Sequence, residues 1–282
     1  MPRVALATCA ELPELDADDA LLIGPLAARG VEAVPAVWDD PAVDWNAFDL
    51  TVVRNTWDYI GRRDAFLRWA RTVAALRNPA DVLDWNTDKR YLAELEAAGL
   101  PTVPTTFVAA GDLFALGDGC DEWVVKPTVS AGSQDTLRLR DPDAVADHVQ
   151  RLHAKGKTAM VQPYLAEVDE AGETALLYFG GAFSHAIRKG PMLRPGEVKD
   201  PELYYAEEIS PREPSVQERA LADRVVAAVT ERFGTPLYAR VDLLPSGGTP
   251  RIIELELTEP SVFVGYGDGA PERFADAIAA VL

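Results

Sequence analysis

The stretch LYARVDLLPSGGTPRIIELEL (residues 237–257) predicts two β-strands joined by a tight turn. The Ser-Gly-Gly-Thr segment near its centre has the small, flexible residues that a short hairpin turn requires. Side chains alternate between the two faces of a strand, so Ile253 and Leu255 should point towards a core. Glu254 and Glu256 then point to the opposite face. The stretch therefore predicts an antiparallel hairpin with one apolar face and one acidic face.

Pairing of the two strands about a centre near residue 248 places Asp242 opposite Glu254, on the face that also carries Glu256. Like charges opposed across a ladder are destabilising unless something neutralises them. A hard divalent cation, Mg²⁺ or Mn²⁺, does this when carboxylates and substrate phosphates hold it together. A solvated sheet face is the alternative, and the hairpin alone slightly favours it. Arg240 alternates onto the same face, where it could bind a phosphate or form a structural salt bridge.

The first third of the chain alternates predicted strands with predicted helices. Apolar runs at 4–9, 31–37 and 50–56 are typical of buried strands. The segments 16–30 and 63–76 have the periodicity and end residues of helices. This βαβ pattern predicts a small parallel sheet with helices on both sides, whose ligands would bind beyond the carboxyl ends of the strands.

The rest of the chain adds strands, hairpins and four predicted helices. A second hairpin is indicated by Gly180-Gly181 between two apolar runs. Helical patterns occur at 86–101, 141–155, 213–234 and 271–282. The sequence shows no internal repeat and no low-complexity tract.

Composition narrows the class of protein. The chain has 282 residues, enough for two domains, and a formal net charge of -18, which argues against a nucleic-acid partner. Its two cysteines are far apart, which indicates neither a disulfide framework nor a metal-ligand motif. The N-terminus lacks a signal-peptide pattern, and no stretch approaches the roughly 20 apolar residues of a membrane-spanning helix. We therefore expect a cytoplasmic protein with no membrane partner.

Two lysines stand in unusual positions. Lys126 leaves an apolar strand and enters a loop of small residues, 130–133, whose backbone N–H groups could approach a phosphate. The loop matches no Walker or dinucleotide-binding motif, and an ordinary hairpin loop is the alternative. Lys89 falls in the first turn of its predicted helix, where a cation opposes the helix dipole. That position suits a lysine that reaches a ligand anion.

In order along the chain, these features resemble the ATP-grasp superfamily in its glutathione-synthetase-like branch. The fragments that carry the resemblance are NTDKRYL, VVKPTVSAGS, VQPYLAEVDEAGET, YARVDLL and RIIELELTEPS. The resemblance covers essentially the whole chain and implies an α/β fold in which two lobes clamp ATP. It divides the chain into an N-terminal parallel βαβ substrate domain (1–84), a central lobe (85–161) and a C-terminal lobe with the metal site (162–282).

The resemblance also implies roles for individual residues. Residues expected to contact ATP are Lys89, Lys126, Ser130, Ala131, Gly132, Ser133, Gln162, Pro163, Tyr164, Leu165 and Glu173. The expected ligands of Mg²⁺ or Mn²⁺ are Asp242, Glu254 and Glu256, and Arg240 falls on a phosphate-contacting position. Relatives often have Asn where Glu256 stands, and a GDKR segment of glutathione synthetases is GETA here. The second departure argues against glutathione as the product.

A site of this kind supports an ATP-dependent carbon–nitrogen ligase. A substrate carboxylate attacks the γ-phosphorus of ATP, and a nitrogen nucleophile then attacks the acylphosphate, with release of ADP and phosphate. Arg240, Lys126 and Arg188 are the expected catalytic residues. A lid is expected to keep water from the acylphosphate, and the segment 190–205 is the candidate, with a mobile surface loop as the alternative.

Substrate contacts are expected at the strand ends of the N-terminal domain and beside the lid. The candidates are Arg54, Asn55, Thr8, Tyr59, Lys189 and Ser261. Packing of the two lobes against each other is an equal alternative for the segment RNTWDY that contains Arg54. Glu259 leads into the Pro260-Ser261 turn, which is better placed to meet the substrate than the metal.

Within the superfamily, TCAELPEL, RNTWDY, WNTDKRYL and ELELTEPSVF are similar to ligases that close O-ureido-D-serine into D-cycloserine in antibiotic biosynthesis. The substrate would then be a small, amino-acid-like molecule. An intermolecular amino-acid or dipeptide ligase is the nearest alternative, and a degenerate nucleotide-binding module is an alternative of another class. The opening βαβ pattern also fits a dinucleotide-dependent oxidoreductase, but the glycine fingerprint is missing. The sequence leaves open whether the protein is a monomer or a homodimer.

Overall fold

The N-terminal part of the chain forms a parallel sheet, as predicted. The computed structural model describes residues 1–116, 120–193 and 208–282. The N-terminal sheet has the strand order β2-β1-β3-β4. Its strands are β1 (Arg3–Thr8), β2 (Glu32–Val37), β3 (Leu50–Val53) and β4 (Leu76–Arg77), and its helices include α1 (Ile23–Ala28) and α2 (Arg63–Thr72). The 3₁₀ turns η1 (Asp19–Leu22), η2 (Trp45–Ala47) and η3 (Trp57–Arg62) lie between these elements.

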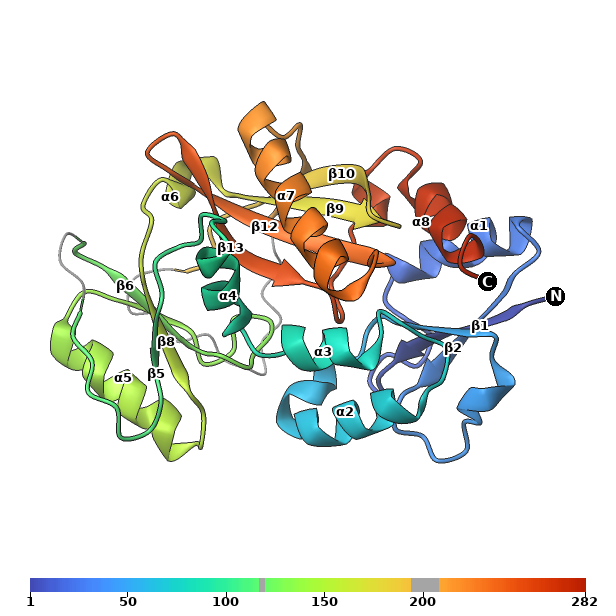
Figure 1. Cartoon of the computed structure of the whole chain (residues 1–282), viewed down its shortest axis with the longest axis horizontal. Coiled ribbons are helices and arrows are strands. Elements are labelled where there is room, and N and C mark those ends of the chain that lie inside the picture. The colour runs from blue at the N-terminus through green and yellow to red at the C-terminus, as the bar shows by residue number, and fades with distance from the viewer. Residues whose placement is uncertain (117–119, 194–207) are drawn as a thin grey trace.

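A small antiparallel sheet forms the opposite end of the molecule (Figure 1). Its order is β5-β8-β6-β7, with β5 (Thr106–Val108), β6 (Trp123–Pro127), β7 (Leu137–Leu139) and β8 (Ala159–Pro163). Helix α5 (Pro142–Ala154) packs on this sheet through Val145, Val149 and Leu152, which share one helical face. Asp141 begins the helix by accepting a hydrogen bond from the backbone N–H of Asp143.

The largest sheet lies between these two ends. Its order is β11-β10-β9-β12-β13. The strands are β9 (Glu173–Phe179), β10 (Ala182–Lys189), β11 (Ile209–Pro211), β12 (Tyr238–Ser246) and β13 (Thr249–Glu256). Helix α7 (Val216–Phe233) covers one face, and a capping box between Ser215 and Glu218 fixes its start. The short α6 (Val168–Ala171), the 3₁₀ turn η4 (Val264–Tyr266) and the closing α8 (Ala270–Ala279) complete this part.

The hairpin β12–β13 has the predicted register, with one exception. Asp242 pairs with Glu254 and Arg240 with Glu256, while the turn glycines, Gly247 and Gly248, both have positive φ. A β-bulge follows, because Leu243 pairs with Ile252 and leaves Ile253 as the extra residue. The prediction that Ile253 faces the core is therefore wrong: Ile252 is fully buried, and Ile253 shares the acidic face.

The predicted single helix at 86–101 is wrong, because two shorter helices occupy this connection. Helix α3 (Ala80–Asn86) ends at Asn86, and α4 (Tyr91–Ala97) begins only after Lys89. The buried amide of Asn86 donates to Leu255 O at 2.7 Å and accepts from Leu257 N at 2.6 Å. The side-chain amide thus forms the two hydrogen bonds that a neighbouring strand would form with this end of β13. A helical pattern in the sequence does not predict these bonds.

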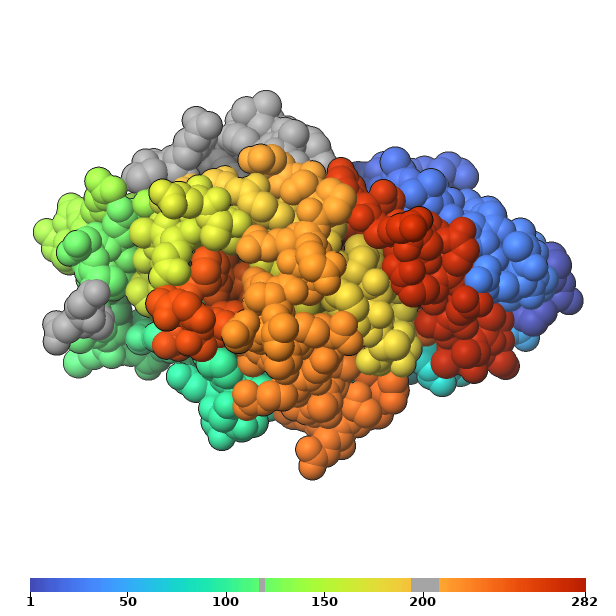
Figure 2. All heavy atoms as spheres, turned by 90° about the horizontal axis from the view of Figure 1, so that it is seen from above, coloured from blue at the N-terminus to red at the C-terminus, as the bar shows by residue number. Residues whose placement is uncertain are grey.

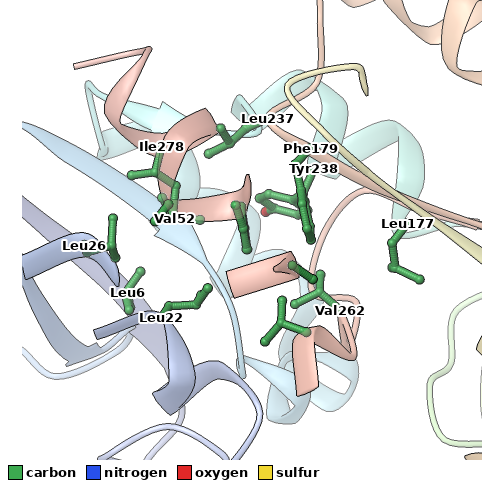
Figure 3. Close-up of a cluster of buried hydrophobic side chains, with 14 of the residues drawn as sticks. Leu6, Leu22, Leu26, Val52, Leu177, Phe179, Leu237, Tyr238, Val262 and Ile278 are labelled. Carbon is green, nitrogen blue, oxygen red and sulfur yellow. The ribbon is translucent and has the colours of Figure 1, made fainter. Parts of the chain in front are cut away.

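The N-terminal sheet and the C-terminal part share one hydrophobic core (Figure 3). Leu6, Leu22 and Val52 come from the N-terminal part, and Phe179 and Tyr238 from the largest sheet. Helix α8 lies beside α1, which brings the C-terminal helix against the first α-helix of the chain (Figure 1). In the space-filling view the N-terminal atoms adjoin the C-terminal helix, while the central lobe lies at the far end (Figure 2).

The three-part division of the chain remains a proposal. The limit between residues 84 and 85 falls inside α3, and the limit between 161 and 162 falls inside β8. The shared core shows that the N-terminal sheet is not packed independently of the C-terminal part. Within the described ranges, no helix has both the length and the apolarity that crossing a membrane requires.

A substitution at Phe274 tests how much the shared core contributes to stability. Its ring is fully buried in α8 and stacks on Phe179 with ring centroids 4.3 Å apart. We expect Phe274→Ala to lower the free energy of unfolding by about 3–5 kcal/mol in urea denaturation, because the cavity cannot collapse fully. The control Val216→Ala, at a side chain 82% exposed, should stay within about 0.5 kcal/mol of wild type. Equal effects of both variants would contradict the shared core.

Candidate active site

A cavity of about 180 Å³ lies between the small antiparallel sheet (β5-β8-β6-β7) and the largest sheet. Its wall contains charged side chains from both sheets and from the connection between α3 and α4. Its lining includes Lys89, Lys126, Ser130, Ala131, Gly132, Ser133, Gln162, Pro163, Tyr164, Leu165, Glu173, Lys189, Arg240, Glu254 and Glu256. All eleven predicted ATP contacts are therefore in this wall.

Both lysines singled out in the sequence are buried and reach this cavity. Lys126 projects from β6, and Lys89 lies between α3 and α4. Lys89 Nζ donates to Ser130 O at 2.6 Å and forms an ion pair with Glu254 at 3.1 Å. Burial lowers the pKa of Lys126, and Lys89 and Lys189 add to this effect, while Glu254 opposes it. Concentrated positive charge of this kind attracts a polyanionic ligand.

The small-residue loop (130–133) closes one side of the cavity. Gly132 and Ser133 both have φ of 59°, the left-handed region that glycine adopts without strain. Lys89 holds the start of the loop, because its backbone N–H donates to Thr128 O at 2.8 Å. Successive backbone amides in such a turn form a concave surface suited to an anion.

The opposite end of the cavity is apolar and carries one unpaired acceptor. Val124, Leu244 and Ile253 contribute to its wall, so the bulge in β13 places an apolar side chain there. Gln162 is buried and donates from Nε2 to Thr105 Oγ1 at 2.8 Å. No described residue donates to Gln162 Oε1. An apolar wall of this kind suits a planar ring such as adenine.

The acidic face is neutralised by basic side chains. Asp242 is buried and pairs with Lys189 Nζ at 2.6 Å and with Arg240 Nη2 at 2.8 Å. Although burial favours the neutral acid, Arg240 and Lys189 outweigh it and hold the pKa of Asp242 well below its usual range. Glu256 pairs with Arg240 as well. Burial and the nearby Glu254 and Asp242 still raise the pKa of Glu256 to about 8, although Arg240 opposes them.

The donor set fits a hard divalent cation, although the acids do not already form a cluster. No group of three metal-ligating side chains is drawn together among the described residues. Glu254 and Glu256 nevertheless project into the cavity with side chains 25% and 26% exposed, and carboxylate oxygens are what Mg²⁺ prefers. Burial and, after it, repulsion by Glu254 and Asp242 raise the pKa of Glu256, and a bound cation would relieve that repulsion.

Arg188 and Lys189 point to opposite faces of β10. The expectation that Arg188 is catalytic is not supported, because its guanidinium donates to Ala171 O at 3.0 Å and it is not in the cavity wall. Neighbouring residues on β10 point to opposite faces, which sends Lys189 inward instead. Lys189 Nζ also contacts Glu173 at 2.6 Å. Burial raises the pKa of Glu173 to about 7 despite this partner.

The segment around Arg54 joins the lobes and does not line the cavity. The Arg54 guanidinium is fully buried, donates to Asp19 Oδ1 at 2.9 Å and to Pro260 O at 2.5 Å, and lies over the Tyr238 ring. A substrate carboxylate cannot reach it in this arrangement, which corrects the prediction of a clamp. Asn55 Nδ2 donates to Asp19 Oδ2 at 2.9 Å, and Thr8 Oγ1 donates to Leu12 O at 2.7 Å.

Two other predicted substrate residues lie near the acidic face. Tyr59 is buried, and burial raises the pKa of its hydroxyl well above the usual value, with Glu259, Glu256 and Glu254 adding to the effect. Ser261 accepts a hydrogen bond from Arg240 Nη1 at its backbone oxygen, at 3.1 Å. Residues 190–193 line the cavity, while the rest of the proposed lid, 194–205, lies outside the described residues.

Sequence reasoning missed Arg138. This side chain projects from β7 and lies over the Tyr164 ring, with Cζ 3.5 Å from the ring centroid. It also pairs with Glu122 and Asp169 and donates to Leu193 O at 3.3 Å. Arg138 thus holds the cavity wall at two places. Its alternation with Leu137 and Leu139 was the available signal.

Comparison with known proteins places the chain in a family. The family model described as "D-cycloserine synthetase DcsG, N-terminal domain" matches residues 4–81. The chain is 36% identical to the cycloserine biosynthesis protein DcsG of Streptomyces lavendulae, over 99% of this chain and 98% of that protein. The crystal structure of D-cycloserine synthetase DcsG superposes with a TM-score of 0.88, at 35% identity and with 99% of each chain covered.

A more distant structure shows the breadth of the fold. D-alanine–D-alanine ligase from Bacillus anthracis, in complex with ATP, matches with a TM-score of 0.68 at 13% identity, covering 100% of this chain and 97% of that one. This likeness concerns the fold alone. Together with the DcsG structure it confirms the ATP-grasp fold that the sequence motifs predicted.

Glu256 tests the electrostatics of the acidic face. Its pKa is raised from 4.5 to about 8 in the folded protein, so wild type should lose stability as the pH rises between these values. Glutamine has no proton to lose. In urea denaturation without nucleotide or metal, we expect Glu256→Gln to be more stable than wild type by about 1 kcal/mol or more at pH 9, and not at pH 4.

The exposed Glu231→Gln is the matched control and should follow wild type at both pH values. A stability difference between Glu256→Gln and wild type that is the same at pH 4 and pH 9 would contradict the raised pKa.

Proposed function

Since this chain belongs to the family of D-cycloserine synthetase DcsG, we propose that it closes O-ureido-D-serine into D-cycloserine at the expense of ATP. The chain is an ATP-dependent ligase, and the ring closure would be its particular reaction. The observation that carries the proposal is the convergence of Lys89, Lys126 and Lys189 with Arg240 on one cavity. Glu254 and Glu256 stand in the same wall.

The proposed nucleotide would lie along the cavity with adenine in the apolar end. Val124, Leu244 and Ile253 would contact the ring, and the small-residue loop and the buried lysines would face the phosphates. Glu254 and Glu256, with Asp242 behind them, would hold Mg²⁺, which when bound supplies positive charge against the phosphates. The cation itself is part of the proposal.

The basic side chains supply what the first chemical step requires. Attack of the substrate carboxylate on the γ-phosphorus moves negative charge onto phosphate oxygens, so fixed cations lower the barrier. Arg240 is held at both Asp242 and Glu256, and Lys189 at Asp242 and Glu173. These positions are fixed before the substrate arrives, so little reorganisation is needed during the reaction.

The second step needs no nucleophile from the protein. The ureido nitrogen that is bonded to oxygen loses its proton and attacks the acylphosphate carbon within the same molecule, the carbon–oxygen bond to phosphate breaks, and the ring closes. The carbamoyl group on the ring nitrogen must then leave by hydrolysis, as carbon dioxide and ammonia, to give D-cycloserine. An intramolecular nucleophile has a high effective concentration, provided that the chain of the substrate is folded towards its own carboxyl group. Met192 and Leu193 at the cavity mouth would help to exclude water from the acylphosphate.

A panel of substrates tests the proposed function. We expect phosphate release with MgATP and O-ureido-D-serine alone, with D-cycloserine identified by mass, and no release with D-serine or D-alanine alone. An absolute requirement for a second amine would instead support an intermolecular ligase. Binding of ATP without turnover of any compound would support a nucleotide-binding module.

Glu254 tests the metal proposal. We expect Glu254→Gln to lower kcat/KM by about 10³-fold, because a carboxylate that would hold Mg²⁺ beside the transferred phosphate is lost, and to weaken the dependence of the rate on Mg²⁺ concentration. The control Glu231→Gln should keep wild-type kinetics. Activity of Glu254→Gln within threefold of wild type, with an unchanged Mg²⁺ dependence, would exclude Glu254 as a ligand.

A further inference from the structure

Arg138 is a buried cation directly behind the apolar end of the cavity. On the small antiparallel sheet it pairs with Val124 of β6, and Val124 pairs with Gln162 of β8. Residues directly opposite each other on antiparallel strands point to the same face of the sheet. Arg138 therefore shares the face that carries these two lining residues. Its own side chain is 7% exposed and lies behind the wall, since it is not among the described lining residues.

The guanidinium of Arg138 covers an aromatic ring of the wall. Its Cζ atom is 3.5 Å from the centroid of the Tyr164 ring, a close cation–π contact. Asp169 joins the two side chains, because it accepts from the Tyr164 hydroxyl at 2.5 Å and from Arg138 Nη1 at 3.3 Å. Glu122 pairs with Arg138 Nε and balances the charge. The Tyr164 ring is thus held both at its face and at its hydroxyl.

These contacts reach the apolar end of the cavity at two points. Tyr164 and Ile253 both pack on the apolar cluster that contains Leu244. Arg138 Nη1 also donates to Leu193 O at 3.3 Å, and Leu193 lines the cavity beyond the end of β10. One buried side chain therefore connects wall residues that follow β8 and β10, which belong to different sheets.

Arginine is suited to this position, because its planar group stacks on a ring while its N–H groups donate sideways to carboxylate and carbonyl oxygens. We propose that Arg138 is a positioning residue that sets the affinity of the site for the adenosine part of ATP by holding Tyr164 and Leu193. This inference rests on the proposed placement of adenine at the apolar end. The phosphate end has its own fixed groups, Lys89 and Lys126.

Preorganisation is the physical reason for the expected effect. Without Arg138, the Tyr164 ring and the backbone at Leu193 would have to be ordered when ATP binds, and this ordering costs affinity. The cost falls on a ligand that reaches the apolar end. A ligand that consists of phosphates alone does not incur it.

The test compares two ligands by calorimetry in the absence of the amino-acid substrate. ATP with Mg²⁺ would occupy both ends of the cavity, and inorganic triphosphate with Mg²⁺ the phosphate end alone. We expect Arg138→Gln to raise the Kd of ATP about 10-fold and that of triphosphate by less than about threefold. The matched control is Arg140→Gln, because Arg140 also pairs with Glu122 but has a side chain 65% exposed. It should change neither Kd.

Equal losses of affinity for both ligands, or the same loss in Arg140→Gln, would overturn the inference, since a general defect acts on every ligand. Urea denaturation checks that the variants fold. Should Arg138→Gln fail to fold, Arg138→Lys takes its place, because lysine keeps the charge without the planar group. An unchanged Kd of ATP in that variant would then overturn the inference.

Steady-state kinetics replaces the second ligand if wild type does not bind inorganic triphosphate. The KM of ATP should then rise about 10-fold in Arg138→Gln, while kcat and the KM of the amino acid stay within about threefold. A comparable fall in kcat would overturn the inference, because a residue that acts only on adenosine binding leaves the chemical step unchanged at saturating ATP.

A double-mutant cycle tests whether Arg138 acts through Tyr164. Tyr164→Leu removes the ring that the guanidinium covers and should also weaken ATP more than triphosphate. The loss of ATP affinity in the double variant should be smaller than the product of the two single losses. A loss equal to that product would overturn action through Tyr164.

Ile253→Ala separates this inference from the proposed placement of adenine. Ile253 lines the apolar end itself, so its truncation should weaken ATP and not triphosphate. A selective loss in Ile253→Ala but not in Arg138→Gln would overturn the role of Arg138 alone. No selective loss in either variant would contradict the placement as well. Ring closure does not enter, because both ligands are measured without the amino-acid substrate.

Discussion

The buried pairing of Asp242 with Lys189 and Arg240 is the interaction on which the site depends. Charges taken out of water need partners of the opposite sign, and removal of one partner leaves the other uncompensated at a cost of about 3–5 kcal/mol. Each cation here is shared, because Arg240 also contacts Glu256 and Lys189 also contacts Glu173. These charges on β9, β10, β12 and β13 therefore depend on one another for neutralisation.

Local chemistry explains why much of this site was predictable. The Gly-Gly turn sets the register of the hairpin, so the pairing of Asp242 with Glu254 followed from the sequence alone. Lys89 and Lys126 were conspicuous because each stands where a surface lysine is unusual. The ATP-grasp fold was recognised from the order of five fragments, none of which is specific by itself.

Other features depend on contacts between distant segments. Whether Arg188 or Lys189 faces the cavity is a matter of which face of β10 is covered, and alternation does not settle that. Arg54 was equally consistent with a substrate clamp and with packing until Asp19 and Pro260 were seen around it. The bulge at Ile253 depends on how β12 and β13 pair, so the pattern of one strand does not predict it. In each case the partner lies far away in the sequence.

We propose that a substrate carboxylate attacks the γ-phosphorus of ATP at this acidic face. The most direct measurement uses O-ureido-D-serine with ¹⁸O in its carboxylate and follows the label by mass spectrometry of the released phosphate. With both carboxylate oxygens labelled, we expect one ¹⁸O atom in each phosphate formed, because the attacking oxygen leaves with phosphorus when the ring closes. Phosphate without ¹⁸O, formed together with cyclised product, would contradict it.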